Sequence, residues 1–212
     1  MFAPSELSPR TRDIAARAIH RAWEWVSAVG MVGPDDPHGR RFARMGTHSG
    51  IAFPPGALMG ERWIAIGNET LVGPHVSLAV GMPGEEMETD EPIIVIGDRC
   101  NVGRGSSIVA RCHVVIEDDV TIAPNVYITD HNHAYEDVSI PISQQWPTEA
   151  PVRVGAGSWL AAGATVLPGA DIGRNVTVAA GAVVRGTIPD YAVVAGVPGR
   201  VVRRFQPGEG WV

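Results

Sequence analysis

The sequence predicts an all-β protein, most of which folds as a parallel β-helix of six-residue repeats. The first observation is a strict interval of six between aliphatic residues: Val154, Leu160, Val166, Ile172, Val178 and Val184. The same interval recurs in Ile66, Val72 and Leu78, in Ile96, Val102 and Ile108, and in Ile116, Ile122 and Ile128. A period of six fits neither an α-helix nor an alternating strand, and hexapeptide repeats are typical of parallel β-helices. The second observation is that a small residue usually follows, as in Gly155, Ala161, Gly173 and Ala179.

The composition agrees with a turn-rich β architecture. The 212 residues include 25 glycines and 17 prolines scattered among valine and isoleucine, which indicates turns rather than disorder. The net charge is −6 without a basic stripe, so we expect no nucleic-acid partner. No apolar run approaches the roughly 20 residues that span a bilayer, and no secretory signal pattern opens the chain. We therefore expect a cytoplasmic protein that does not cross a membrane.

Cys100 and Cys112 are the only cysteines. Two are too few for a disulfide scaffold, and their spacing does not suit a cysteine zinc site. We expect both to be core-filling thiols in a reducing compartment.

Residues 9 to 29 read as one amphipathic helix. Ser8 is a plausible N-cap, Pro9 suits the first helical position, and Gly30 is a natural stop. Trp23 and Trp25 are expected to anchor this helix to the main body or to a neighbouring subunit. The predicted organisation is a helix and irregular connection over 1–60, the β-helix over 61–204, and a tail over 205–212.

Two interruptions break the six-residue rhythm. Residues 79–92 are rich in acidic and turn residues, and Glu85, Glu86 and Glu88 indicate a solvated loop more than a metal or partner site. The longer interruption, 129–153, brings Asp130 and His131 together where the chain leaves the coil. A loop of this length in a solenoid usually has a function. Histidine titrates near neutral pH, so a general base, a metal site and a polar turn all remain open here.

Three segments resemble the hexapeptide-repeat O-acetyltransferases, especially the maltose and galactoside acetyltransferase branch. Residues 122–133 read IAPNVYITDHNH, and residues 154–173 read VGAGSWLAAGATVLPGADIG. The third segment, 179–200, opens with AAGAVV and ends with IPDYAVVAGVPGR. The resemblance runs from about residue 93 to residue 204, and the histidine segment combined with AGVPGR is its most specific part.

The resemblance implies a left-handed coil, a homotrimer with active sites between subunits, and acetyl-CoA as acyl donor without a metal. His131 matches the catalytic histidine, which would take the proton from an acceptor hydroxyl. Asn101 matches an acceptor-side asparagine, and Trp159 matches the tryptophan that walls the site. The N-terminal region, which helps to shape the acceptor pocket in that branch, does not resemble that of the maltose and galactoside enzymes, so the acceptor is not carried over. We expect a small molecule with a hydroxyl group, a sugar or a sugar-like compound.

For the donor, the resemblance places the pantetheine arm along Ala162 and Ala180, where small residues allow a close approach. Arg185 and Gly186 match the next pair that contacts CoA, although many relatives carry lysine in place of Gly186. Arg200 and Arg203 match terminal basic positions, and guanidinium groups suit phosphate oxygens.

Two other classes of function remain as alternatives. Some zinc-dependent carbonic anhydrases use the same left-handed helix and three histidines, and His75, His113, His131 and His133 are the candidates here. The sequence lacks the histidine-x-x-x-x-histidine spacing of those enzymes. A non-catalytic β-helix scaffold and N-acyl transfer to an amino sugar also remain open.

Overall fold

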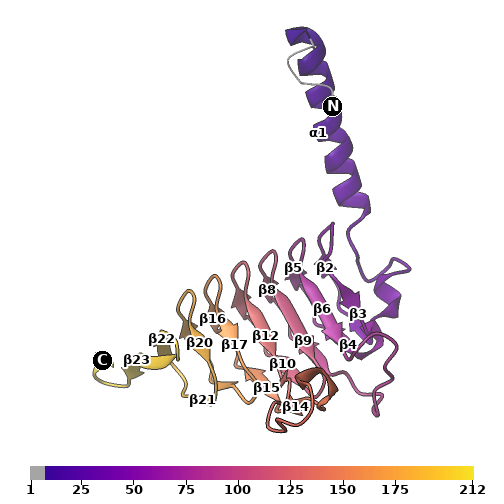
Figure 1. The fold of residues 1–212 in the computed structure, drawn as a ribbon. Helices are drawn as coiled ribbons and strands as arrows, with labels where there is room; N and C mark the ends of the chain where they lie inside the picture. The colour runs from indigo at the N-terminus through magenta and orange to yellow at the C-terminus, as the bar shows by residue number, and fades with distance from the viewer. Residues whose placement is uncertain (1–7) are drawn as a thin grey trace.

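The computed structural model describes residues 8–212, and its main body is a left-handed parallel β-helix (Figure 1). The fold class predicted from the six-residue interval is confirmed. Short strands stack into three long sheets that form the flat faces of the coil. Sheet 1 contains β1 (Arg44–Met45), β4 (Ile64–Ile66), β7 (Ile94–Ile96), β10 (Val114–Ile116), β15 (Val152–Val154), β18 (Asp171–Ile172) and β21 (Thr187–Ile188).

The other two faces follow the same order along the stack. Sheet 2 contains β2 (Gly50–Ile51), β5 (Leu71–Val72), β8 (Asn101–Val102), β11 (Thr121–Ile122), β16 (Trp159–Leu160), β19 (Thr177–Val178), β22 (Ala192–Ala195), β23 (Arg200–Gln206) and β24 (Gly210–Trp211). Sheet 3 contains β3 (Leu58–Met59), β6 (Ser77–Val80), β9 (Ser107–Ala110), β12 (Tyr127–Thr129), β17 (Thr165–Val166) and β20 (Val183–Val184). Among residues 8–212, a short 3₁₀ turn at Gly39–Arg41 precedes β1, and two more, Glu61–Trp63 and Ile142–Gln144, lie between strands.

The aliphatic residues of the six-residue interval form one continuous core. In sheet 1 they stack in register along the ladder Ile66, Ile96, Ile116, Val154, Ile172 and Ile188. All of them are buried. Each strand is only two to four residues long in the regular coils, so a coil has no core of its own and depends on its neighbours.

The small residue after each core position has a direct steric cause. A Cβ added to Gly155 would lie 2.5 Å from the backbone carbon of Gly173 in the next coil. Adjacent coils therefore touch backbone to backbone at this corner, and a side chain there would push them apart.

The first coil begins earlier than expected. β1, β2 and β3 pair in parallel with β4, β5 and β6, so residues 44–59 belong to the β-helix and not to an irregular connection. The interval is disturbed here, because Met45 and Ile51 are six residues apart whereas Leu58 follows after seven. Met45 and Leu58 are also only partly buried. Because of these irregularities, the six-residue interval does not predict this first coil.

The predicted N-terminal helix is confirmed as α1 (Pro9–Val29), with the Ser8 hydroxyl accepting a hydrogen bond from the Thr11 amide at 3.2 Å. None of its residues is buried, and Figure 1 shows it standing away from the β-helix. The Trp23 ring contacts Phe53 at 6.4 Å between centroids, but Trp23 remains 56% exposed and Trp25 66% exposed. Within one chain the tryptophans therefore do not bury the helix. No helix in residues 8–212 has the length and apolarity to cross a membrane.

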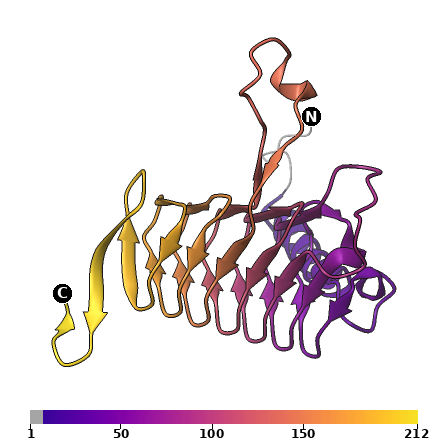
Figure 2. The same ribbon diagram turned by 90° about the horizontal axis from the view of Figure 1, so that it is seen from below.

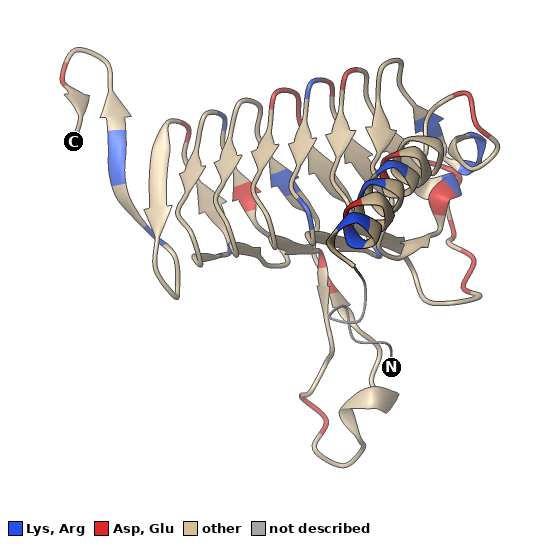
Figure 3. Cartoon of the chain, turned by 90° about the horizontal axis from the view of Figure 1, so that it is seen from above, with Lys and Arg blue, Asp and Glu red and all other residues tan. Residues whose placement is uncertain are grey.

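The C-terminal residues form an antiparallel extension of sheet 2. β23 pairs with β22, and β24 folds back on β23 so that Phe205 lies opposite Trp211. Residues 205–212, expected to be a tail, therefore belong to a hairpin, in which the Phe205 and Trp211 rings pack with their centroids 5.8 Å apart. Figure 3 shows that arginine and acidic residues are interspersed over α1 and the turns, and that β23 carries arginine.

Candidate active site

Both interruptions of the repeat leave the β-helix at the same corner, where sheet 3 passes into sheet 1. The 81–93 loop follows β6, and the 130–151 loop follows β12. The turn 111–113 lies between them in the intervening coil. The 130–151 loop stands well out from the stack (Figure 2) and begins with a two-stranded antiparallel ribbon of β13 (His131–Asn132) and β14 (Thr148–Glu149). The predicted 79–92 and 129–153 loops are therefore brought to one edge.

His131 is held at the base of this ribbon by a buried carboxylate. Its Nδ1 lies 2.9 Å from Asp130 Oδ1, and its side chain is 20% exposed. Thr129 Oγ1 lies 3.3 Å from the same nitrogen. No hydrogen bond to Nε2 occurs among residues 8–212, so this second ring nitrogen remains available.

Asp130 is itself held by the main chain of the preceding coil. Its carboxylate accepts hydrogen bonds from the backbone N–H groups of Arg111, Cys112 and His113 at 2.7 to 3.1 Å. Burial alone would raise the pKa of Asp130, but the His131 hydrogen bond and these three N–H groups hold the pKa below its ordinary value. The carboxylate is thus ionised at neutral pH.

An ionised Asp130 defines the chemistry that His131 can perform. A carboxylate only accepts hydrogen bonds, so Nδ1 carries the proton, and in the neutral imidazole Nε2 then carries the lone pair. This is the tautomer of a general base, oriented by a carboxylate that also stabilises the imidazolium. The sequence shows Asp130 beside His131 but does not indicate its role, because the three N–H donors come from a coil 17 to 19 residues earlier.

A cavity of about 580 Å³ lies between the two loops. Its residues come from both loops and the turn between them: Glu85, Glu86, Met87, Glu88, Thr89, Ile93, Arg111, Cys112, Trp146 and Glu149. The expectation of a solvated acidic loop is wrong for Glu85, which binds the buried Arg111 side chain through both carboxylate oxygens at 2.7 Å. Nothing in the repeat pattern indicated that Arg111 would be buried.

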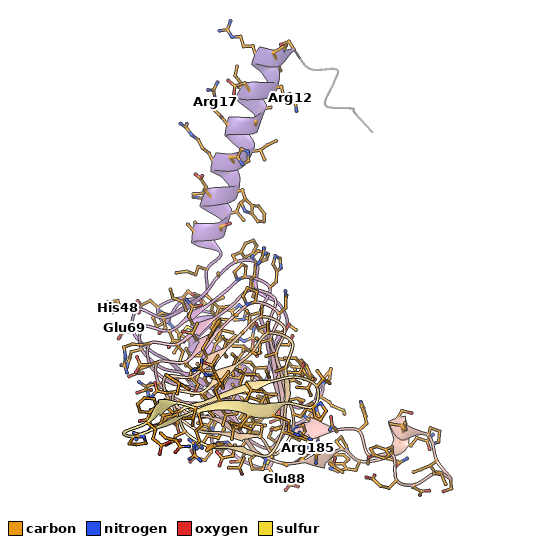
Figure 4. All side chains as sticks on the ribbon, turned by 90° about the vertical axis from the view of Figure 1, so that its left-hand side faces the viewer. Arg12, Arg17, His48, Glu69, Glu88 and Arg185 are labelled. Atoms are coloured by element: carbon orange, nitrogen blue, oxygen red, sulfur yellow. The ribbon has the colours of Figure 1, made fainter. Side chains whose placement is uncertain are left out.

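The remaining expected site residues lie on different parts of the surface. Arg185 and Gly186 occupy the same corner as His131, between β20 and β21, and Figure 4 shows Arg185 at the edge from which the loop departs. Ala162 and Ala180 are exposed and stacked one coil apart at the corner between sheets 2 and 3, where the Gly181 amide donates to the Ala162 carbonyl at 3.0 Å.

Asn101 and Trp159 lie on sheet 2, in the two strands on either side of β11, and both are paired with Thr121 of β11. Both are exposed, and Trp159 is 48% exposed. The flat face that sheet 2 forms runs from the corner with sheet 1 to the corner with sheet 3, whereas His131 lies at the third corner, between sheets 3 and 1. One chain therefore does not bring Asn101 or Trp159 to His131.

Arg200 and Arg203 are exposed on β23, near the C-terminus. Arg200 Nη1 donates to the Gly199 carbonyl at 2.9 Å, and the Arg203 guanidinium lies 5.8 Å from the Trp211 ring centre. Neither forms an ion pair within residues 8–212, so both guanidinium groups can bind an anion.

The two cysteines differ. Cys100 is buried, as expected, whereas Cys112 is exposed and borders the cavity. Cys112 lies in the turn whose N–H groups hold Asp130, and this turn interrupts the core interval.

Among residues 8–212, no group of three or more His, Cys, Asp or Glu side chains is placed to hold a metal ion.

Comparisons with known proteins identify the repeats. Residues 151–186 match the family model described as bacterial transferase hexapeptide (six repeats), and residues 93–130 match hexapeptide repeat of succinyl-transferase. A probable acetyltransferase of Mycobacterium tuberculosis is 33% identical over 68% of this chain and 43% of its own length. The galactoside O-acetyltransferase of Escherichia coli is 29% identical over 70% of this chain and 68% of its own length.

A solved structure supports the fold independently. A mutant of AntD, an N-acyltransferase from Bacillus cereus in complex with dTDP-4-amino-4,6-dideoxyglucose and coenzyme A, has a TM-score of 0.68 at 16% identity. The match covers 84% of this chain and 92% of that one. The chain spans 43% to 61% of the length of the curated relatives that it matches first.

Two stretches of the chain carry hexapeptide repeats of transferase families, and the resemblance expected from the sequence is confirmed. The chain is similar to named acetyltransferases, the galactoside O-acetyltransferase of Escherichia coli among them.

Proposed function

We propose that this protein is an O-acetyltransferase that moves an acetyl group from acetyl-CoA to a hydroxyl of a sugar or sugar-like molecule. The observation that carries the proposal is the Asp130–His131 pair, with Nδ1 turned to a buried carboxylate and Nε2 available. The sugar class is supported by the relatives, which include a galactoside O-acetyltransferase and an N-acyltransferase bound to a dTDP-sugar and coenzyme A.

In the proposed reaction, Nε2 of His131 takes the proton of the acceptor hydroxyl as its oxygen attacks the thioester carbonyl carbon. Asp130 stabilises the imidazolium that forms. The tetrahedral intermediate then collapses, the carbon–sulfur bond breaks, and the imidazolium returns the proton to the departing thiolate. The products are an acetyl ester and free CoA, and His131 is again neutral.

The proposed site requires a second copy of the chain. Asn101 and Trp159 lie on sheet 2, away from the corner of His131, so they can flank the acceptor only from a neighbouring subunit. We propose that the pantetheine arm runs along the exposed Ala162 and Ala180, that Arg185 and Gly186 contact CoA next, and that Arg200 and Arg203 hold its nucleotide end. We propose a homotrimer with sites between subunits, as the resemblance implies.

Calorimetry with CoA and acetyl-CoA on metal-stripped protein tests the donor without knowledge of the acceptor. We expect saturable binding that weakens in an Arg200→Ala/Arg203→Ala variant. His131→Ala should retain CoA binding and lose about 10²–10⁴-fold in transfer. No binding at millimolar CoA would overturn the acetyltransferase proposal and leave the zinc lyase and the scaffold to be tested. Transfer within threefold of wild type in His131→Ala would overturn the assignment of the base.

A further inference from the structure

Arg111 is a buried cation at the meeting point of three segments. Its side chain is 3% exposed. Nη1 and Nη2 donate to the two carboxylate oxygens of Glu85 at 2.7 Å, and Nε donates to Glu149 Oε1 at 3.0 Å. The Trp146 ring centre lies 4.9 Å from the guanidinium carbon. A paired fork of this kind is among the stronger and more directional contacts available to a protein.

The partners of Arg111 come from the two excursions that leave one corner of the β-helix. Glu85 belongs to the 81–93 loop, and Trp146 and Glu149 belong to the 130–151 loop. Arg111 lies in the short turn of the coil between them. Its guanidinium therefore ties both loops to the rigid stack.

The same residue also contacts the catalytic pair through its main chain. The Arg111 N–H donates to both oxygens of Asp130, at 2.9 and 3.1 Å. Glu149 lies directly opposite His131 in the antiparallel β13–β14 pair, and side chains of directly opposed residues lie on the same face of a ribbon. Arg111 is thus linked to Asp130 by its main-chain N–H, and to the strand of His131 by its side-chain hydrogen bond to Glu149.

The cluster depends on its charges. A buried guanidinium that loses one carboxylate is left incompletely paired, which is costly at low exposure. The hydrogen bond from Arg111 lowers the pKa of Glu85 against the effect of burial, so Glu85 stays ionised at neutral pH. Neutralising Glu85 should therefore loosen the link between the 81–93 loop and the ribbon.

We propose that Arg111, braced by Glu85, is a positioning residue that fixes the His131-bearing ribbon against the β-helix. The proposal rests on the proposed function in taking His131 as the base. In this proposal the 81–93 loop acts neither as a metal site nor as a solvated loop, because it supplies the carboxylate of Glu85 that holds Arg111 in place.

The test variant is Glu85→Gln, which removes the charge and keeps the shape. The matched control is Glu117→Gln, because Glu117 also pairs with an arginine, Arg153 at 2.8 Å, but at the corner where sheet 1 passes into sheet 2, away from His131. The first measurement is proton NMR of histidine-labelled protein, in which the Nδ1 proton of His131 bonded to Asp130 gives a low-field signal that His131→Ala assigns. The second is hydrogen exchange of residues 131–149, and the third is steady-state transfer with CoA affinity.

We expect Glu85→Gln to shift or broaden the low-field signal, to speed exchange in the ribbon, and to lower kcat roughly 10- to 100-fold at unchanged CoA affinity. Glu117→Gln should leave all three unchanged. Arg111→Lys should recover part of the activity lost in Arg111→Gln, since lysine keeps the charge but not the fork.

An unchanged signal and unchanged exchange in Glu85→Gln would overturn the proposal, whatever the activity. If the wild type transfers no acetyl group but the signal and exchange still respond, the positioning role stands and the proposed function fails. Should the Arg111 variants not fold, Glu85→Gln alone decides the matter through the same readouts.

Discussion

The Nδ1 atom of His131 lies 2.9 Å from a carboxylate oxygen of Asp130, a side chain with no exposed surface. Three backbone N–H groups of the preceding coil fix that carboxylate. The β-helix stack therefore determines the orientation of the imidazole, even though the residue itself belongs to a protruding loop.

Replacing Asp130 by asparagine should impair transfer without preventing CoA binding. The substitution keeps the size of the side chain but removes the charge that stabilises the imidazolium, so we expect kcat to fall about 10²-fold or more. Asp98→Asn is the matched control, because Asp98 accepts a backbone N–H from Asn68 at 2.7 Å at a different corner. Equal effects of the two substitutions on kcat would show that the loss at Asp130 is merely structural.

Asp130 should also make stability depend on acidity. Its folded-state pKa is lowered from 3.8, so its contribution is fully present above that value and is lost as pH falls through the lower folded pKa. We expect Asp130→Asn to lower the free energy of unfolding by about 1–3 kcal/mol at neutral pH. Urea unfolding at several pH values should show this difference shrinking below about pH 4. A difference that persists unchanged into strong acid would contradict the prediction.

The core column should be sensitive to single deletions. Leu160 is completely buried on sheet 2, whereas Leu71 on the same sheet is 52% exposed. Leu160→Ala should cost about 2–5 kcal/mol in unfolding free energy, because it removes packed atoms and leaves a cavity. Leu71→Ala should change stability by less than about 1 kcal/mol. Similar losses for both leucines in denaturant titrations would argue against the observed register.

Only one thiol of the native protein should react with a maleimide or disulfide reagent. Cys112 is exposed and Cys100 is buried. Burial raises the pKa of both thiols, and Asp130 and Glu149 further raise that of Cys112. Labelling of Cys112 should therefore be slow at neutral pH and accelerate in alkali, since the thiolate is the nucleophile. Mass spectrometry checks the site, Cys112→Ser should abolish native labelling, and rapid modification of Cys100 would refute the expectation.

Two inactive variants should complement each other if the sites lie between subunits. His131→Ala and Asn101→Ala lose different halves of the proposed site. Unfolding and refolding them as a 1:1 mixture should restore roughly one quarter of the sites, because each site draws its two halves from different chains at random. Light scattering should report a trimer for each variant and for the mixture. Activity that stays at the level of the single variants would place both halves in one chain.

The repeat was readable in the sequence because each coil imposes the same local demand. An aliphatic residue must point inward on every face, and a small residue must follow where the backbones touch, as at Gly155. Such one-dimensional order appears directly as an interval of six. The first coil could not be predicted in this way, because Leu58 follows Ile51 after seven residues instead of six.

The β-helix, the N-terminal helix, the two interruptions and the histidine at the start of the longer loop could all be predicted from local sequence patterns. The surroundings of that histidine could not, because they are made by contacts between residues far apart in the chain. Asp130 meets N–H groups from residues 111–113, and Arg111 joins Glu85 to Glu149 across 26 and 38 residues of chain. These contacts run between coils and loops rather than along the repeat. They depend on how the coils stack, which no local periodicity encodes.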